Sequence, residues 1–267
     1  MGAKDESATL TSFAMPLEPE TRLRRAAPGS LDLPPPFRAI ALREVGDAFA
    51  HAVAVADREG AGTLVHVGRF DLAEFAVVLE PEEQLRTARR AIYAGMAALA
   101  DTLAAHAPPE KPIVIAWPDA LLVDGGLVGG GRLAWPADVK EDAAPPWLVF
   151  AGMIRTVAIG ENEPGLNPLA AALDDEGFVD LGSGRLIESF ARHLMAAIDA
   201  WQQDGFAEIA KSYVSRLAPE KAARRDIAEN GDLLVRRAAT AAAECRSLVA
   251  ALTQPSWLDP ATGGVRR

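Results

Sequence analysis

Residues 115–136, IAWPDALLVDGGLVGGGRLAWP, contain the residue types and spacing that favour ligand chemistry. Glycines inside a strand let a ligand or a second backbone approach closely, and this segment has two glycine runs, at 125–126 and 129–131. Trp117 offers a flat apolar wall beside them. Pro118 cannot donate a backbone hydrogen bond, so we expect the first strand to end or bulge there. The pattern favours a cleft for a small molecule.

A second interpretation explains the same glycines without a ligand. Residues 124–126, Asp-Gly-Gly, are typical of a tight hairpin turn, and the glycines at 129–131 then form a bulge. The common phosphate-binding motifs do not match. No Lys-Ser/Thr pair follows the glycines, and they lie inside a hairpin rather than between a strand and a helix. The residues leave both interpretations open.

Hydrophobic periodicity predicts the elements that must position this segment. Apolar alternation and short apolar runs predict strands, with 111–118 as a buried central strand. The strand-like segments are 38–44, 62–70, 74–81, 111–118, 120–135 and 146–159. Helical periodicity predicts helices at 46–60, starting after Asp47, at 82–106, and over 185–217 with a break at Asp204-Gly205.

The order of these elements predicts an α+β fold, in which a mixed sheet has flanking helices, because several strands are joined by hairpins. Residues 1–30 mix charged residues, Ser and Pro, so we expect a flexible arm. Residues 31–218 form the predicted main domain. A hairpin around Asn230-Gly231, of the two-residue type I′ kind, then begins a small C-terminal β-module at 219–267.

The composition narrows the class of partner. The chain has 267 residues, 49% of them hydrophobic, which is enough for a full core. Its formal net charge of -10 disfavours nucleic acid and anionic membrane, since both attract basic surfaces. A single cysteine and a charged N-terminus without an apolar signal-peptide run favour a reducing compartment. We therefore expect a cytoplasmic protein with no nucleic-acid or membrane partner.

Motifs spread along residues 37–250 resemble, in the same order, those of the biotin/lipoate protein ligase family. Trp117-Pro118-Asp119 is similar to the family's Trp-Pro-Asn-Asp, and residues 124–129 overlay its Gly-x-Lys-x-x-Gly hairpin. The strand at 147–154 and the helix pair over 190–217 resemble the family's next elements, and 224–235 looks like the start of its C-terminal β-module.

This resemblance implies a class II biotin/lipoate ligase-like domain. Such enzymes use ATP and Mg²⁺ to activate a small carboxylic acid of the biotin, lipoate or octanoate type as an acyl-adenylate. The acyl group then passes to a lysine on a carrier domain, whereas related octanoyl transferases use a cysteine and no ATP. The residues that the resemblance implies for ligand binding are Trp117, Pro118, Asp119, Gly125, Gly126, Gly129, Gly131 and, in the C-terminal module, Arg246.

The chain departs from the family pattern where charge is needed. The position of the family's lysine is Gly126, and the second carboxyl of Trp-Pro-Asn-Asp is Ala120. Removing one fixed electrostatic group from an active site typically costs about 3–4 kcal/mol of transition-state stabilisation. The family's Gly-Arg-rich adenylate loop is reduced to the pair Gly68-Arg69, so the chain has no complete motif for ATP and Mg²⁺.

Two arginines are the candidates to replace the missing lysine as catalytic cations. Arg132 follows the glycines and, in a continuous strand, has the same parity as Gly126, so we expect both to face one side. Arg69 lies near the expected mouth of the pocket. The alternative for each arginine is a solvated surface residue. Cys245 falls in the C-terminal module without an adjoining His or Lys, and we expect a small buried residue rather than a nucleophile.

Three functions remain open. The first is a divergent ligase or acyl transferase, and the second is an inactive ligase-fold protein, a pseudoenzyme, that binds a small acid or nucleotide. The third is an interaction scaffold without a small ligand, which the acidic composition and the C-terminal module would suit. A fold does not by itself determine an activity, so the residues do not decide whether the protein is an enzyme.

Overall fold

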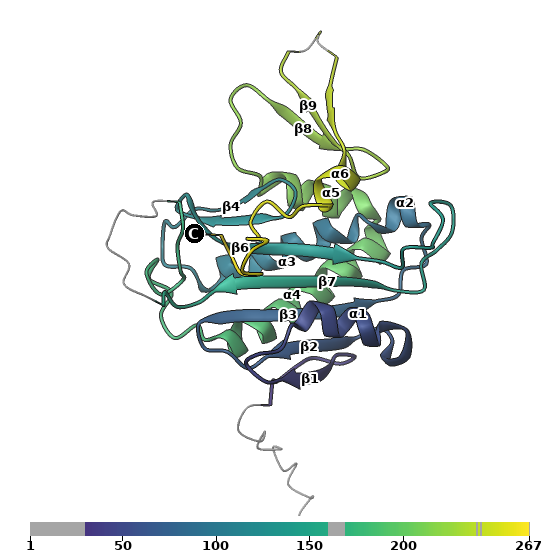
Figure 1. Ribbon diagram of the computed structural model, residues 1–267. Helices are drawn as coiled ribbons and strands as arrows, with labels where there is room; N and C mark the ends of the chain where they lie inside the picture. The colour runs from purple at the N-terminus through teal and green to yellow at the C-terminus, as the bar shows by residue number, and fades with distance from the viewer. Residues whose placement is uncertain (1–29, 160–168, 239, 241, 267) are drawn as a thin grey trace, which may run out of the picture.

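A mixed sheet of seven strands forms the centre of the molecule (Figure 1). The structure is a computed structural model, and it describes residues 30–159, 169–238, 240 and 242–266. The strand order is β1-β2-β3-β7-β6-β5-β4. The β1 and β2 strands are parallel, and the other neighbours pair antiparallel. The strands are β1 (Arg38–Leu42), β2 (Thr63–Val67), β3 (Leu72–Leu79), β4 (Ile113–Ala116), β5 (Ala120–Val123), β6 (Gly126–Ala134) and β7 (Leu148–Arg155). The predicted α+β architecture is confirmed, whereas the predicted arm lies, except for Ser30, outside the described residues.

Helices cover both faces of this sheet (Figure 1). The α1 helix packs on one face through small side chains, and α3 and α4 pack on the other, where the larger apolar cluster lies. The helices are α1 (Ala48–Glu59), α2 (Leu85–Ala88), α3 (Ala91–His106), α4 (Ser183–Asp204), α5 (Phe206–Ser215) and α6 (Leu248–Leu252). No helix in the described ranges is both long enough and apolar enough to cross a membrane.

The ends of the helices follow the sequence signals in two places and depart from them in one. The carboxylate of Asp47 accepts a hydrogen bond from the backbone N–H of Ala50 at 2.8 Å and caps α1, as predicted. The predicted break between α4 and α5 lies at Gly205, which has φ +82°. The helix predicted over 82–106 is instead divided into α2 and α3 at Arg89-Arg90. The guanidinium groups of both arginines form ion pairs with glutamates.

The prediction that β4 is a central strand is wrong, because β4 forms an edge of the sheet. Its apolar side chains are nevertheless partly or fully buried, since the chain after α5 covers the open edge. The backbone N–H of Ile115 donates to the carbonyl of Arg216, and the N–H of Ala218 donates back to Ile115, each at 2.8 Å. The apolar run bounded by prolines therefore predicted the burial of this strand correctly, but it did not predict the position of the strand in the sheet.

A small second sheet follows α5 and consists of β8 (Arg224–Ile227), β9 (Leu233–Arg236) and β10 (Glu244–Arg246). The predicted hairpin is present, but residues 228–232 connect its strands and only Gly231, at φ +91°, has a positive φ in that turn. The predicted boundary at 219 falls between α5 and β8. The predicted burial of Cys245 is wrong, since its side chain is exposed on β10.

The chain then returns to the large sheet. Residues 256–266, here called the C-terminal segment, cross the face that carries α1, and Figure 1 shows this segment in yellow in front of β6 and β7. Trp257 is its anchor and is only 1% exposed. Its indole packs with Leu72, Ala120 and Met153 in an apolar cluster separate from the one under α1. The C-terminal segment and α1 thus share one face of the sheet.

Candidate functional site

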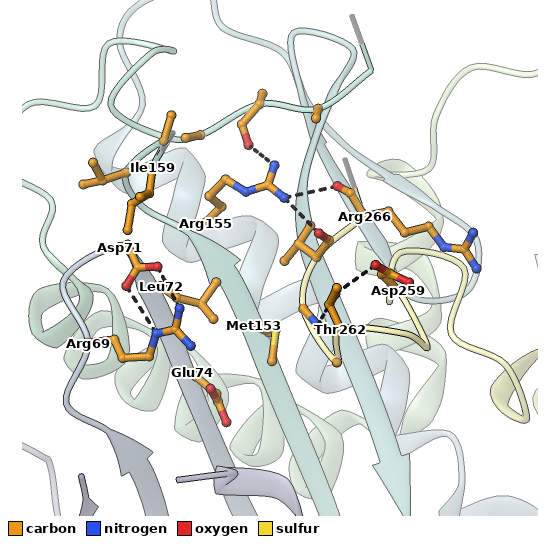
Figure 2. Close-up of a pocket in the computed structure, with 18 of the residues that line it drawn as sticks. Arg69, Asp71, Leu72, Glu74, Met153, Arg155, Ile159, Asp259, Thr262 and Arg266 are labelled. Carbon is orange, nitrogen blue, oxygen red and sulfur yellow. Dashed lines mark hydrogen bonds and ion pairs between the residues drawn. The ribbon is translucent and has the colours of Figure 1, made fainter. Parts of the chain in front are cut away.

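A cleft of about 970 Å³ lies on this face, between the start of α1 and the C-terminal segment (Figure 2). Its floor comes from three adjacent strands, β3, β7 and β6, and its rim comes from connecting loops. The floor side chains are Leu72, Glu74, Met153, Arg155 and Arg132. The core on the opposite face holds these strands rigidly, because Phe75 and Phe150 pack against Phe190 of α4.

Charged side chains dominate the lining, with four arginines and five carboxylates. Arg69 forms a two-point ion pair with Asp71, at 2.8 Å between Nη2 and Oδ2 and 3.2 Å between Nε and Oδ1. Hydrogen bonding by Arg69, assisted by its charge, lowers the pKa of Asp71. Across the cleft, Arg155 Nη2 donates to the carbonyls of Val265 and Arg266, so this arginine holds the C-terminal segment (Figure 2).

Arg132 comes from β6 and lies beneath the start of α1. Its Cζ is 3.9 Å from the ring centroid of Phe49, and its Nη2 is 3.5 Å from Oδ1 of Asp47. Glu74 lies nearby on β3, is 6% exposed, and accepts a 2.9 Å hydrogen bond from the N–H of Ala48. Burial raises the pKa of Glu74, although that hydrogen bond opposes the effect. The start of α1 is therefore capped by the protein's own carboxylates, while Arg132 and Arg69, each paired with a carboxylate, line the cleft.

Arg132 and Gly126 do not share a face of β6, which corrects the parity expectation. The pairing of β5 with β6 shifts between Leu121 and Leu122, which lie opposite Gly129 and Leu127 respectively. This bulge reverses the alternation, because an extra residue in one strand moves later side chains to the other face. Arg132 therefore lines the cleft, whereas a Cβ on Gly126 would lie 2.6 Å from the Cβ of Ala171.

The Trp-Pro-Asp motif lies outside the cleft lining. The indole of Trp117 donates to the hydroxyl of Tyr93 at 3.1 Å within the main core. The carbonyl of Pro118 accepts a 2.9 Å hydrogen bond from the hydroxyl of Tyr213. Asp119 has no exposed surface, and its Oδ1 accepts a 2.8 Å hydrogen bond from the hydroxyl of Ser256. Burial raises the pKa of Asp119 to about 6.

Four of the glycines, at 126 and 129–131, are packed against the protein's own atoms, whereas Gly125 has open space around it. Gly125 lies in the hairpin turn at φ +85°, and Gly129 lies in the bulge, where a side chain would overlap the backbone of β7. A Cβ on Gly130 would overlap Trp257, and one on Gly131 would lie 2.7 Å from the sulfur of Met96. The space that the sequence suggested for a ligand is thus occupied here by core side chains and by the C-terminal segment.

Of the residues expected at the site, the structure brings together Arg69 and Arg132 in the cleft lining. Arg246 lies on β10 and pairs with Glu244 and Glu220, at 2.8 and 3.2 Å, outside that lining. The ligand-binding role expected for Arg246, Trp117, Pro118, Asp119 and the glycines remains a prediction.

Sequence reasoning missed Glu74, Arg155 and the C-terminal segment as parts of the cleft. Glu74 did leave a signal, since it is the one charged residue within the apolar strand LAEFAVVL. An acid in such a position needs a specific partner, and here the partners come from the start of α1. The C-terminal segment left one signal, Trp257, because a large aromatic side chain packs in a core by default, but its Pro- and Gly-rich composition is otherwise typical of an exposed end.

The sequence and the fold were compared with known proteins. Residues 33–215 match the model of the biotin/lipoate A/B protein ligase family. No curated protein matches the chain. A solved biotin protein ligase-like protein of unknown function from Silicibacter sp. TM1040 is 27% identical, with a TM-score of 0.72 over 84% of this chain and 100% of that one.

Solved biotin protein ligases have the same fold at lower identity. The enzyme from Aquifex aeolicus is 14% identical, with a TM-score of 0.60 over 79% of this chain and 95% of that one. Its complex with biotin and ATP has a TM-score of 0.55 over 74% and 91% of the two chains, at 14% identity. The family match extends over most of the main domain and includes the strands that form the floor of the cleft. The chain belongs to the biotin/lipoate A/B protein ligase family.

Proposed function

We propose that this protein is a divergent biotin/lipoate-type ligase or acyl transferase that acts on a small carboxylic acid bound in the cleft. The observation that carries the proposal is the placement of Arg69 and Arg132 on adjoining parts of one cleft in a member of this family. Arginine binds carboxylate and phosphate oxygens through two parallel hydrogen bonds. These two guanidinium groups then supply the positive charge that the family obtains from the lysine replaced by Gly126.

The cleft suits a carboxylate together with a nucleotide in size. Its volume of about 970 Å³ lies at the upper end of the range for small-molecule sites, roughly 300–1,000 Å³. Arg69 and Arg132 would face the carboxylate and the phosphates. No three metal-binding side chains gather within the described ranges, so Mg²⁺ would enter with the phosphates and need only one or two carboxylates of the cleft.

The proposed chemistry has two steps. A carboxylate oxygen of the acid attacks the α-phosphorus of ATP, the P–O bond to pyrophosphate breaks, and pyrophosphate leaves. A neutral lysine amine of a carrier domain then attacks the acyl carbon, so that an amide forms, AMP leaves and the amine loses a proton. Negative charge develops on the phosphoryl and carbonyl oxygens in these steps, and preorganised cations stabilise such charge most strongly in a site that excludes water. We place this activity in the cytoplasm, in line with the charge and cysteine usage of the chain.

The test is a panel of carboxylic acids, from acetate through octanoate together with biotin and lipoate, each with ATP and Mg²⁺. We expect at least one acid to raise the melting temperature and to release pyrophosphate, because a ligand of the native state raises apparent stability. Arg132→Gln should reduce pyrophosphate release by about 10²–10³-fold, as expected for loss of one electrostatic group. Arg58→Gln, on an exposed part of α1, is the control and should leave release unchanged. Absence of binding and of release across the panel would overturn the proposal.

A second function is favoured by one observation. Among the described residues that line the cleft there is no lysine, and Arg69 and Arg155 are both engaged by the protein's own oxygen atoms. A ligase fold that binds an acid or a nucleotide without transferring it would have these features. Stabilisation by an acid without pyrophosphate release, in the same panel, would identify this function.

A further inference from the structure

The indole of Trp257 packs against the apolar floor of the cleft, although it is not among the side chains that line the open space. It lies against Met153, Glu74 and Arg132, all of which also line the cleft. The gap between these side chains and the indole leaves no room for a water molecule. Leu72 and Met153, two apolar side chains of the floor, therefore pack in part against a side chain of the protein itself.

One glycine of β6, Gly130, lies directly against this indole. A Cβ at Gly130 would overlap the indole ring at Cδ1 and Nε1 and also the backbone oxygen of Asp119, so a larger residue would displace the ring or the neighbouring backbone. The indole Nε1 donates to the carbonyl oxygen of Gly131 at 2.9 Å. Gly130 thus leaves space for a flat apolar group, and in this protein that group is Trp257.

Contacts on both sides hold the indole in place. Before it, the hydroxyl and N–H of Ser256 donate to the buried carboxylate of Asp119. After it, the guanidinium of Arg155 binds the carbonyls of Val265 and Arg266. The hydrogen bonds to Asp119, Gly131 and Arg155 would all have to break before the indole could leave, so we treat it as a fixed wall and not as a lid.

We infer that Trp257 is a specificity-determining residue, which restricts the cleft to short polar carboxylic acids by filling the space that an apolar acyl chain would need. Four arginines and five carboxylates lie among the apolar side chains that line the space that remains, and an alkyl chain placed there would remove some of these charges from water without pairing them. This inference rests on the proposed function, in that it takes the cleft as the site of the acid.

The test measures the affinity for straight-chain acids, from acetate through octanoate, by calorimetry on the full chain. For the wild type we expect affinity to fall once the chain exceeds the shortest acids. Trp257→Gly should bind octanoate about ten-fold or more tightly than the wild type does and leave the affinity for acetate unchanged, since each extra methylene in an apolar pocket has an effect of this size. Trp147→Gly is the matched control, because this tryptophan packs near α1 and does not line the cleft. It should not change the preference for chain length.

A second measurement locates the cavity. Free indole should raise the melting temperature of Trp257→Gly and not that of Trp147→Gly, because only the first variant lacks the indole beside Gly130. If Trp257→Gly shows no cooperative unfolding transition, Trp257→Phe, which retains most of the packing, should still shift the preferred chain length upward. An unchanged preference in Trp257→Phe would then overturn the assignment.

The remaining outcomes separate the two proposals. If the wild type binds octanoate as tightly as Trp257→Gly does, Trp257 does not determine specificity, while binding of an acid in the cleft still stands. If no acid binds to the wild type or to either Trp257 variant, the proposed function is wrong, and the role of Trp257 is wrong with it.

Discussion

The indole nitrogen of Trp257 donates a hydrogen bond to the carbonyl oxygen of Gly131, 2.9 Å away, across 126 residues of sequence. This contact joins the end of the chain to the middle of the central sheet. It also explains why residues 256–266 provide part of the cleft wall, although they follow the small second sheet in sequence. The end of this chain is therefore part of the main domain's packing.

Removal of the indole should destabilise the protein strongly. Trp257→Ala deletes a side chain that is 1% exposed, and large-to-small changes of buried aromatic residues cost about 3–5 kcal/mol in free energy of unfolding. Urea denaturation should show this loss. Phe70→Ala, at a side chain that is 68% exposed, is the control and should change stability by no more than about 0.5 kcal/mol. Equal urea midpoints for both variants would show that the side chain of Trp257 is not buried against the sheet.

Restoring the family's lysine should not restore a ligase site. In Gly126→Lys the new Cβ would lie 2.6 Å from the Cβ of Ala171, and the bulge in β6 directs this position away from Arg132. We expect lower stability, by about 1–3 kcal/mol as for overpacking, and no gain in pyrophosphate release. Gly125→Asn is the control, since the neighbouring position has open space and asparagine tolerates a positive φ. A gain of activity in Gly126→Lys would show that the lysine side chain reaches the cleft.

The buried carboxylate of Asp119 should make stability depend on pH. Burial raises its pKa from 3.8 to about 6, so between these values the folded protein binds more protons than the unfolded chain does. The contribution of this group to stability therefore falls as pH rises through that window, by up to about 3 kcal/mol at 1.36 kcal/mol per pKa unit. Asp119→Asn keeps an acceptor for the Ser256 hydroxyl and removes the charge. The free energy of unfolding of Asp119→Asn, relative to that of the wild type, should increase as the pH rises from about 4 to about 7.

The control for this measurement is Asp124→Asn, at an exposed position of the same hairpin. Denaturant midpoints across the pH range should show an increasing difference for Asp119→Asn and none of that size for Asp124→Asn. A constant difference for Asp119→Asn would mean that the pKa of its carboxyl group is the same in the folded and unfolded states.

Release of Arg69 from its ion pair should strengthen anion binding. Asp71→Asn replaces a two-point partner of Arg69 with a neutral group, so the guanidinium becomes available to a ligand. The pKa of Asp71 is lower in the folded protein than in the unfolded chain. Its ion pair therefore stabilises the protein at pH values above the pKa of the unfolded state, and this stabilisation is lost as the pH falls through the pKa of the folded state. With both side chains partly exposed, the loss should not exceed about 1 kcal/mol.

Calorimetry with pyrophosphate tests the gain in affinity. Asp175→Asn, which removes the same charge from the cleft rim but no ion pair, separates the release of Arg69 from a general change in potential. Equal gains for Asp71→Asn and Asp175→Asn would indicate that net charge, and not the freed guanidinium, controls anion binding.

Local signals in the sequence determined most of the secondary structure and the family. Asp47 at the start of α1, Gly205 between α4 and α5, and the turn at 124–126 each have a chemical preference that acts within a few residues. The order of the motifs identified the family because it depends on covalent sequence alone. Arg69 and Arg132 were also singled out as candidates in this way, since a missing cation in a family pattern directs attention to the remaining cations nearby.

Tertiary structure alone decided what fills the space beside the glycines. Sequence shows that Gly130 leaves room, but whether a ligand or the chain's own indole occupies it depends on a contact between residues more than a hundred positions apart. The same holds for the direction of Arg132, which one extra residue in a bulge reverses, and for β4, which lies at an edge although its side chains are apolar. Long-range packing and strand register have no local signature, because they are set by the free energy of the whole assembled core.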